Sequence, residues 1–309
     1  MAEIIVSEFM DETIAREAFG GRDLLFDPEL VNEPDRLLAE IGPARALIVR
    51  NRTQVRGALL EAAENLKVVG RLGVGLENID MEACRDKGVA VRPATGANVT
   101  SVAEYVVTAA LILLRGAWTS SQQVVDGKWP RNALIGGEVS GKVLGLVGFG
   151  AIAQAAAKRA QALGMSVLAH DPFLAPDHAA WTNATSASLD KILIASDVIS
   201  LHTPLTDQTR GMIGSFAFAK MKDTAVVINT ARGGVIDEDA LVAALKDGHI
   251  AGAALDVFAD EPMTSQIGEK FAGLPNVILT PHIAGVTTES NLRVSAVTVA
   301  NVLEVLNQN

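Results

Sequence analysis

The sequence predicts a parallel α/β fold in two domains, and three observations support this class. The chain has 309 residues, which suggests about two domains of ordinary size. Its residues are 49% hydrophobic but only 4% aromatic, so Ala, Val, Leu and Ile must build the core. Short apolar runs alternate with helical stretches along the chain, which is the pattern of parallel strands joined by helices.

The first domain opens with a buried strand and alternates from there. Its strands are expected at residues 3–6, 46–50, 66–73 and 89–94. A long helix follows at about 101–115. The last helix, at about 289–306, is amphipathic, and we expect it to return to the first domain and make that domain discontinuous.

A second β/α series begins after an irregular stretch, residues 116–141, which we interpret as an arm that packs on another subunit. Its strands are expected at residues 142–150, 165–171, 197–202, 225–230, 251–257 and 276–280. We therefore predict one domain from residues 1–97 plus 286–309, and a second from residues 98–285.

A glycine-rich turn in the second domain predicts a dinucleotide site. The run GFGAIA at 148–153 follows an apolar strand and opens an Ala-rich helix. Gly148 permits the tight turn, and Gly150 lets the backbone approach a pyrophosphate at the helix N-terminus. Asp171 ends the next strand, at the spacing expected of a carboxylate that accepts hydrogen bonds from a ribose. Its charge would repel a 2′-phosphate, so NAD is favoured over NADP.

Three residues in separate loops carry the chemistry needed to reduce a 2-keto acid. Arg232 offers a planar cation for a carboxylate, His282 a proton donor, and Glu261 a carboxylate that could hold the imidazole. Each residue alone is more often an ordinary surface or turn residue. All three are expected at or just beyond strand ends of one sheet, where active residues gather in open α/β folds.

Composition disfavours several other classes of protein. The net charge of −10 argues against nucleic acid or an anionic membrane as a partner. Cys84 is the only cysteine, so no intramolecular disulfide or cysteine metal cluster is expected, and no histidine has metal-ligand spacing. The acidic start lacks the basic region of a signal peptide, and the apolar run Val102–Leu114 is too short to span a bilayer. We expect a cytoplasmic protein.

The chain resembles the D-isomer-specific 2-hydroxyacid dehydrogenase family nearly end to end. The likeness is carried by GRLGVGLENID (70–80), ANVTSVAEY (97–105), GKWPR (127–131), GLVGFGAIA (145–153), LHTPLTDQT (201–209), INTARGGVIDE (228–238), AALDVFADEP (253–262) and TPHIAG (280–285). Glu77 stands where the family usually has Asp, and Ala153 replaces the third glycine. The resemblance implies two doubly wound sheets, Rossmann-like or flavodoxin-like, with the active-site cleft between the two domains.

The resemblance also implies roles for individual residues. It implies that Arg232 binds and polarises the substrate, that Glu261 pairs with the histidine, and that His282 is the acid/base. Backbone N–H groups of Val74 and Gly75 would meet the substrate carboxylate. Cofactor contacts are implied at Gly148, Gly150, Ala151, Ile152, Asp171, Thr203, Pro204, Thr230 and Asp256. A homodimer built on the nucleotide domain and the 116–141 arm is implied as well.

Within the family the chain looks most like phosphoglycerate dehydrogenases, which present arginines at the positions of Arg50 and Arg131 to a substrate phosphate. Two cations near one pocket favour a second anionic group, as in 3-phosphoglycerate or 3-sulfolactate. Asn51, where those enzymes more often have Ser, puts phosphate in doubt. If both arginines are idle rim residues, glyoxylate or hydroxypyruvate fits. A function of a different class is an NAD-sensing corepressor-like binding protein, which can keep the same three residues. Such a protein is expected to have disordered, charge-rich tails, and this sequence shows none.

Overall fold

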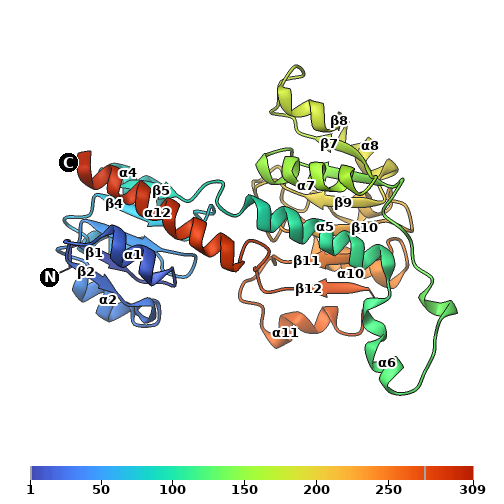
Figure 1. The fold of residues 1–309 in the computed structure, drawn as a ribbon, viewed down its shortest axis with the longest axis horizontal. Helices are drawn as coiled ribbons and strands as arrows, with labels where there is room; N and C mark the ends of the chain where they lie inside the picture. Colours follow the sequence, from blue (N-terminus) through green and yellow to red (C-terminus); the bar gives the residue numbers. More distant parts are fainter. Residues whose placement is uncertain (1, 275, 309) are drawn as a thin grey trace. The chain divides into compact units, whose positions relative to one another are not determined.

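The computed structural model describes residues 2–274 and 276–308, and the chain forms two compact units (Figure 1). Unit 1 comprises Met1–Asn98 and Val286–Asn309, and unit 2 comprises Val99–Gly285. Met1 and Asn309, the ends of the first predicted domain, lie outside the described residues. Each unit is a parallel sheet with helices on both faces, so the predicted fold class is confirmed.

The sheet of unit 1 has five parallel strands in the described residues, in the order β2-β1-β3-β4-β5. The strands are β1 (Ile4–Val6), β2 (Leu24–Phe26), β3 (Ala46–Val49), β4 (Val68–Arg71) and β5 (Ala90–Pro93). Strand β2 was not predicted. It is a three-residue edge strand whose side chains are all partly exposed, so it lacks the fully apolar character of β1 and β3.

Helices cover both faces of this sheet because successive strand residues point to opposite sides. Ile4 and Val6 pack in the cluster under α1 (Glu12–Ala18) and α12 (Thr288–Gln308), whereas Ile5 packs in the cluster on the other face. The helices there are α2 (Pro34–Glu40), α3 (Gly57–Ala62) and α4 (Met81–Asp86). Helix α12 packs directly on β4, where a Cβ on Gly70 would stand 2.6 Å from Val302.

The sheet of unit 2 has seven parallel strands in the described residues, in the order β12-β11-β10-β9-β6-β7-β8. They are β6 (Val143–Val147), β7 (Ser166–His170), β8 (Thr185–Ser186), β9 (Val198–Leu201), β10 (Val226–Asn229), β11 (Gly252–Leu255) and β12 (Val277–Leu279). The strand order reverses between β6 and β9, and doubly wound sheets bind ligands at the carboxyl ends of strands at such a point.

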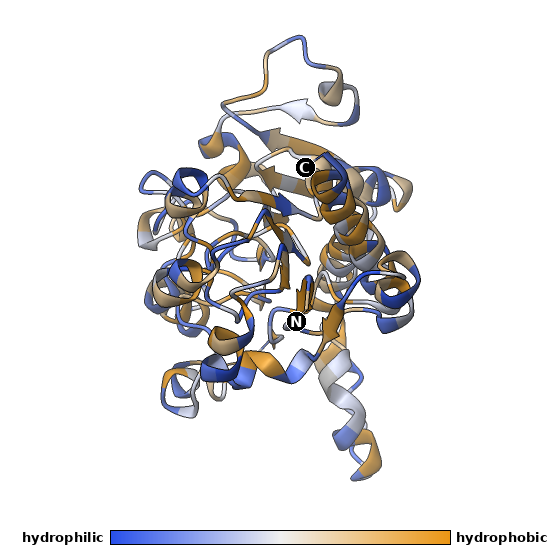
Figure 2. Cartoon of the chain, turned by 90° about the vertical axis from the view of Figure 1, so that its left-hand side faces the viewer, coloured by the Kyte–Doolittle hydropathy of each residue, from blue (hydrophilic) through white to orange (hydrophobic). Residues whose placement is uncertain are grey.

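Two hydrophobic clusters lie on the two faces of this sheet. One contains side chains of α5 (Val99–Arg115) and α7 (Ala151–Ala162) with Val226 and Ile228 of β10. The other contains Val227 with side chains of α8 (Leu189–Ala195), α9 (Ser215–Phe218) and α10 (Glu238–Lys246). The strands that can be seen in Figure 2 are coloured mostly as hydrophobic, as expected of parallel sheets covered on both faces.

The 116–141 segment is largely irregular, as expected, and carries the short helix α6 (Ser121–Val125). It extends away from the rest of unit 2 (Figure 1). Several of its apolar side chains are exposed, including those of Trp118, Val125, Trp129 and Ile135. A second short helix, α11 (Ser265–Gly268), precedes β12. Within the described residues, no helix has the length and apolarity needed to cross a membrane.

Candidate functional site

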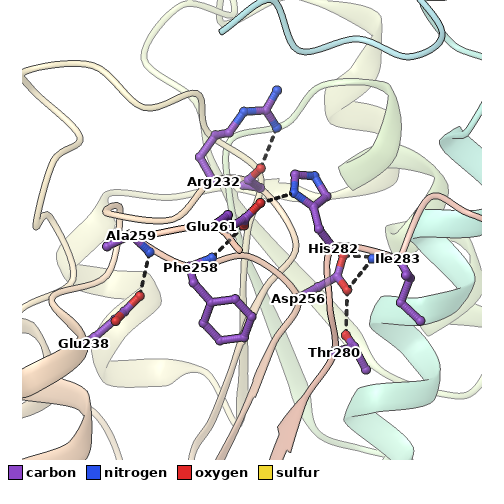
Figure 3. A network of polar contacts seen from close by, with 11 residues as sticks. Arg232, Glu238, Asp256, Phe258, Ala259, Glu261, Thr280, His282 and Ile283 are labelled. Carbon is purple, nitrogen blue, oxygen red and sulfur yellow. Dashed lines mark hydrogen bonds and ion pairs between the residues drawn. The ribbon is translucent and has the colours of Figure 1, made fainter. Parts of the chain in front are cut away.

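Three neighbouring strands of unit 2 bring the predicted trio to one edge of the sheet. Arg232 follows β10, Glu261 follows β11 and His282 follows β12. Because these strands are parallel and adjacent, their carboxyl ends meet at the same edge. The side chains of Arg232, Glu261 and His282 gather there (Figure 3).

Glu261 and His282 form a hydrogen-bonded pair. The Nδ1 atom of His282 lies 2.7 Å from Oε2 of Glu261, while the backbone N–H of Phe258 donates to Oε1 at 2.9 Å. Burial alone would raise the pKa of Glu261, but the bonds from His282 and Phe258 and the charges of His282 and Arg232 outweigh it and leave this pKa lowered. An ionised Glu261 therefore holds the imidazole through Nδ1, and Nε2 is the ring nitrogen that does not face Glu261.

The loop that carries His282 is held by Asp256, a residue that is 1% exposed. Oδ1 of Asp256 accepts from the Thr280 hydroxyl at 2.6 Å and from the N–H of Ile283 at 2.8 Å, and Oδ2 accepts from the N–H of Ala284 at 2.8 Å. His282 has a positive φ of 57°, which non-glycine residues rarely adopt. The bonds to Asp256 stabilise this backbone conformation.

Tyr105 of α5 extends this network. Its hydroxyl lies 2.5 Å from Oγ1 of Thr280. Thr280 has one hydroxyl proton, and a carboxylate cannot donate, so that proton goes to Asp256 and Tyr105 must donate to Thr280. Sequence reasoning did not identify Tyr105 or Thr280, because the two residues are 175 positions apart.

The turn that carries Arg232 is fixed by its backbone. Asn229 accepts from the N–H of Ala231 at 3.0 Å and donates to the carbonyl of Arg232 at 2.9 Å. Nη1 of Arg232 donates to the carbonyl of Ala231 at 2.6 Å. Gly233 packs against the carbonyl of Phe258 so closely that no Cβ would fit. The arginine turn and the loop that carries Glu261 are therefore in backbone contact.

The glycine turn lies at the point where the strand order reverses. Gly148 follows β6 with φ 88°, and a Cβ there would stand 2.7 Å from the carbonyl oxygen of His202, which follows β9. Gly150 is the N-cap of α7, and a Cβ on it would meet no protein atom within 4 Å. The backbone N–H groups of the first turn of α7, which includes Ala151 and Ile152, have no partner within the helix, and such groups can bind a phosphate.

Asp171 follows β7, and its carboxylate bonds the backbone of the glycine turn. Its Oδ2 accepts from the N–H of Phe149 and its Oδ1 from the N–H of Phe173, both at 2.9 Å. Each carboxylate oxygen keeps a lone pair for a further donor such as a ribose hydroxyl.

Two hydroxyl groups near the strand ends have no hydrogen-bond partner although they are buried. These are Oγ1 of Thr203, which follows β9 before the exposed Pro204, and Oγ1 of Thr230, which follows β10. Buried polar groups normally have a partner, so both fit a bound ligand. Burial lowers the pKa of the neighbouring His202 to about 4, so its imidazole is neutral beside such a ligand.

Arg50, Val74 and Gly75 belong to unit 1 and follow the adjacent strands β3 and β4. Val74 is 43% exposed. Nη2 of Arg50 donates to Oδ1 of Asn291 at 2.6 Å, and the guanidinium lies over the ring of Phe9. Nε of Arg50 is buried and has no hydrogen-bond partner. Burial lowers the pKa of Arg50 against the opposing charge of Glu8.

Glu8 shapes the loop that begins at Arg50. Glu8 is 4% exposed, and its carboxylate accepts the backbone N–H groups of Arg50 at 2.9 Å, Arg52 at 3.3 Å and Thr53 at 2.9 Å. These bonds occupy Glu8 with the backbone and leave the guanidinium of Arg50 to Asn291. Sequence reasoning missed both Glu8 and Asn291.

Arg131 lies on the exposed 116–141 arm and is not part of the network around His282. Among the described residues, no group of three or more His, Cys, Asp or Glu side chains is arranged to hold a metal ion.

Comparison with known proteins identifies the class of this fold and site. Residues 107–284, more than half of the chain, match the family model for the NAD binding domain of D-isomer specific 2-hydroxyacid dehydrogenases. The protein is therefore an NAD-dependent oxidoreductase.

Curated relatives place it further. A (S)-sulfolactate dehydrogenase from Chromohalobacter salexigens is 51% identical over 99% of both chains. A hydroxypyruvate reductase from Thermotoga maritima is 42% identical over 85% of each, and a D-3-phosphoglycerate dehydrogenase from Archaeoglobus fulgidus is 41% identical over 85% of this chain and 50% of its own. The chain belongs to the D-isomer specific 2-hydroxyacid dehydrogenase family.

Solved structures agree with this assignment. The TT0316 protein of Thermus thermophilus superposes with a TM-score of 0.89 at 32% identity, over 99% of this chain and 97% of that one. A D-lactate dehydrogenase from Aquifex aeolicus, in complex with NAD and lactic acid, superposes with a TM-score of 0.85 at 30% identity, over 99% of this chain and 95% of that one.

Proposed function

We propose that this dehydrogenase acts on a D-type 2-hydroxy acid and its 2-keto acid with His282 as the acid/base, Glu261 as its partner and Arg232 as the carboxylate-binding residue. The 2.7 Å bond between His282 and Glu261, with Arg232 acting on Glu261, carries this proposal. Unit 2 serves as the NAD-binding domain, and unit 1 as the substrate domain.

The side chains divide the reaction among themselves. Arg232 binds the substrate carboxylate and polarises the adjacent carbonyl. In reduction, Nε2 of His282 gives its proton to the carbonyl oxygen as negative charge develops there, and in oxidation it takes that proton back. Glu261 stabilises the imidazolium and keeps the ring oriented. Val74 and Gly75 of unit 1 meet the carboxylate with backbone N–H groups.

The residues of unit 2 fit a dinucleotide, and NAD supplies or accepts the hydride when bound. Gly148, Gly150, Ala151 and Ile152 would hold its phosphates and Asp171 a ribose. The Thr203–Pro204 segment, with Thr230, would line the site through the unpartnered threonine hydroxyls. Asp256 would contact the carboxamide through the remaining lone pair of Oδ2.

The substrate is proposed to carry a second anionic group, of the 3-sulfolactate or 3-phosphoglycerate type. Arg50 supports this because a largely desolvated guanidinium with an unused buried Nε is suited to bind an anion. Arg131 is the second candidate cation. The similarity to (S)-sulfolactate dehydrogenase favours a sulfonate. The similarity to hydroxypyruvate reductase supports the alternative, a small monoanion such as hydroxypyruvate or glyoxylate.

Steady-state kinetics test this proposal. NADH and NADPH are assayed against sulfopyruvate, phosphohydroxypyruvate, hydroxypyruvate and glyoxylate. We expect NADH to be preferred and one of the dianions to give the highest kcat/KM. His282→Ala should lower kcat by about 10²–10⁴-fold, the usual contribution of an acid/base group, without weakening NADH binding. A His282→Ala enzyme that keeps its turnover would show that another group moves the proton.

We also propose a homodimer in the cytoplasm. The exposed apolar side chains of the 116–141 arm, such as Trp129 and Ile135, form a surface suited to another subunit. Sedimentation should give twice the chain mass for the natural protein and a single chain mass for a Trp129→Glu, Ile135→Glu variant. A dimer that survives both changes would exclude the arm as its basis.

A further inference from the structure

Glu238 is a buried carboxylate that the proposed reaction does not use. It is the first residue of α10, and its side chain is 8% exposed. Glu238 is not needed to cap the helix, because Asp237 is the N-cap residue and its side chain accepts the N–H groups of Asp239 and Ala240 at 3.1 Å. A carboxylate is costly to bury, so its contacts must repay that cost.

The contacts of Glu238 point away from its own helix. Oε1 accepts the backbone N–H of Ala259 at 2.7 Å, and Oε2 lies 2.8 Å from Nζ of Lys270. Lys270 also bonds the exposed Asp239 at 3.2 Å. Burial lowers the pKa of Lys270, but the hydrogen bonds and charges of Glu238 and Asp239 outweigh it and raise this pKa. Glu238 therefore binds the loop after β11 through one carboxylate oxygen, while its other oxygen forms an ion pair with Lys270.

That loop carries the partner of His282. Its two successive N–H groups are accepted by two different carboxylates: Phe258 donates to Glu261 and Ala259 to Glu238. The free oxygen of Glu261 then meets His282 at 2.7 Å (Figure 3). On its other side the same backbone packs against Gly233, beside Arg232. A shift of the 258–261 backbone would move Glu261 relative to both His282 and Arg232.

We propose that Glu238 is a positioning residue, which sets the distance between Glu261 and His282 through its bond to Ala259. This inference rests on the proposed roles of Glu261 and His282. The position of Glu261 depends on whether an oxygen of residue 238 reaches the N–H of Ala259. The negative charge of Glu238 forms the ion pair with Lys270.

Three variants separate the effect of the length of the residue 238 side chain from the effect of its charge. Glu238→Asp keeps the charge but is one methylene too short to reach Ala259. Glu238→Gln keeps one acceptor oxygen for the N–H of Ala259 and loses the charge. Its NH2 group cannot accept from Lys270, whose ammonium group turns to its other partner, Asp239. Asp239→Asn is the matched control, since it removes the charge of the other partner of Lys270 and leaves the Ala259 bond intact.

Two readouts are needed. The first is the pH profile of kcat, together with the dissociation constant of NADH. The second is the low-field Nδ1–H proton resonance of His282, which reports the short bond to a carboxylate without any substrate and is assigned by its loss in His282→Asn. Because this resonance does not depend on turnover, failure of the inference and failure of the proposed function are distinguishable.

We expect Glu238→Asp to lower kcat at least tenfold, to shift the pH profile by half a unit or more, and to weaken or remove the His282 resonance. NADH binding should change less than twofold. Glu238→Gln and Asp239→Asn should stay within threefold of the natural kcat and keep the resonance. A Glu238→Asp enzyme with the natural pH profile and resonance, even one of lower Tm, would overturn the proposal. So would a Glu238→Gln variant as impaired as Glu238→Asp, because charge would then be decisive.

Discussion

Two loops of this protein hold a functional side chain in different ways. In unit 2, His282 is held by the carboxylate of Glu261, and the surrounding backbone by Asp256 and Glu238. In unit 1, the backbone after β3 is held by the carboxylate of Glu8, but the side chain of Arg50 is held by a neutral amide, Asn291.

The difference follows from what each group is proposed to do. A proton donor benefits from a fixed negative partner, because that partner stabilises the imidazolium. A cation that binds an anionic substrate must not already be paired with a carboxylate of the protein. A neutral amide orients the guanidinium without compensating its positive charge. The imidazole of His282 has its carboxylate partner within the chain, whereas Nε of Arg50 is buried and has no hydrogen-bond partner.

Removing the charge of Glu261 should have the largest effect on this comparison. Glu261→Gln keeps an acceptor for Phe258 but loses the ionic bond to His282, so kcat should fall about 10–100-fold, which is the value of a hydrogen bond to a charged group. Because the pKa of Glu261 is lowered, its carboxylate stays ionised from pH 8 to pH 6, so the loss of kcat in this range comes from the missing bond to His282 and not from titration of Glu261. A ratio within twofold of unity would mean that His282 does not depend on Glu261.

Removing Arg50 should have a smaller and more selective effect. Arg50→Ala should raise KM for sulfopyruvate or phosphohydroxypyruvate about tenfold and change KM for glyoxylate less than twofold, since one charge-assisted bond is lost only with a dianion. Arg131→Ala should act more weakly because its exposed charge is screened by water.

Arg52→Ala is the matched control, because Arg52 lies on the same loop and bonds the exposed Asn32. Asn291→Asp keeps a partner for Arg50 but neutralises it, and should raise KM for the dianions as well. Equal KM changes for mono- and dianions in Arg50→Ala would show that Arg50 does not bind the second anionic group of the substrate.

The smallest expected effect concerns Tyr105, the only tyrosine in the chain. Burial, the largest cause, raises the pKa of Tyr105, and the charge of Asp256 raises it further. The folded state therefore holds the phenol proton more tightly than the unfolded state. The resulting stability is present below the ordinary value near 10 and is lost as pH rises above it.

Ultraviolet titration of the folded protein should accordingly give a tyrosinate midpoint above 10. The free energy of unfolding should decline above that pH in the natural protein and less so in Tyr105→Phe, which should itself cost about 1 kcal/mol at pH 7. A midpoint at or below 10 would show that the Tyr105 hydroxyl is not buried beside the charge of Asp256.

The sequence predicted the fold well where residues are apolar and repeat with a clear period, as in β6, β9 and β10. It missed β2 and β8, because Leu24–Phe26 and Thr185–Ser186 are very short edge strands with partly or fully exposed side chains. Such strands form because a neighbouring strand offers free backbone groups, which a local pattern does not record.

The candidate site was predictable to the extent that its residues follow strands. Arg232, Glu261 and His282 each mark a loop at the end of an apolar run. Their supports were not predictable, because those depend on pairs far apart in the chain: Tyr105 with Thr280, and Arg50 with Asn291, 241 positions away. Glu238 stood inside a recognisable segment, but its bond to Ala259 appears only when the two loops fold together.

The return of α12 to unit 1 has a consequence for synthesis on the ribosome. The sheet face that α12 covers, including Ile4, Ile48 and Val68, is made first but waits until all of unit 2 has been translated. At roughly 5–20 residues per second this delay is about 10–40 s. Unit 2 can thus finish folding before the N-terminal unit does, and the exposed strands of the nascent chain are the part most in need of a chaperone.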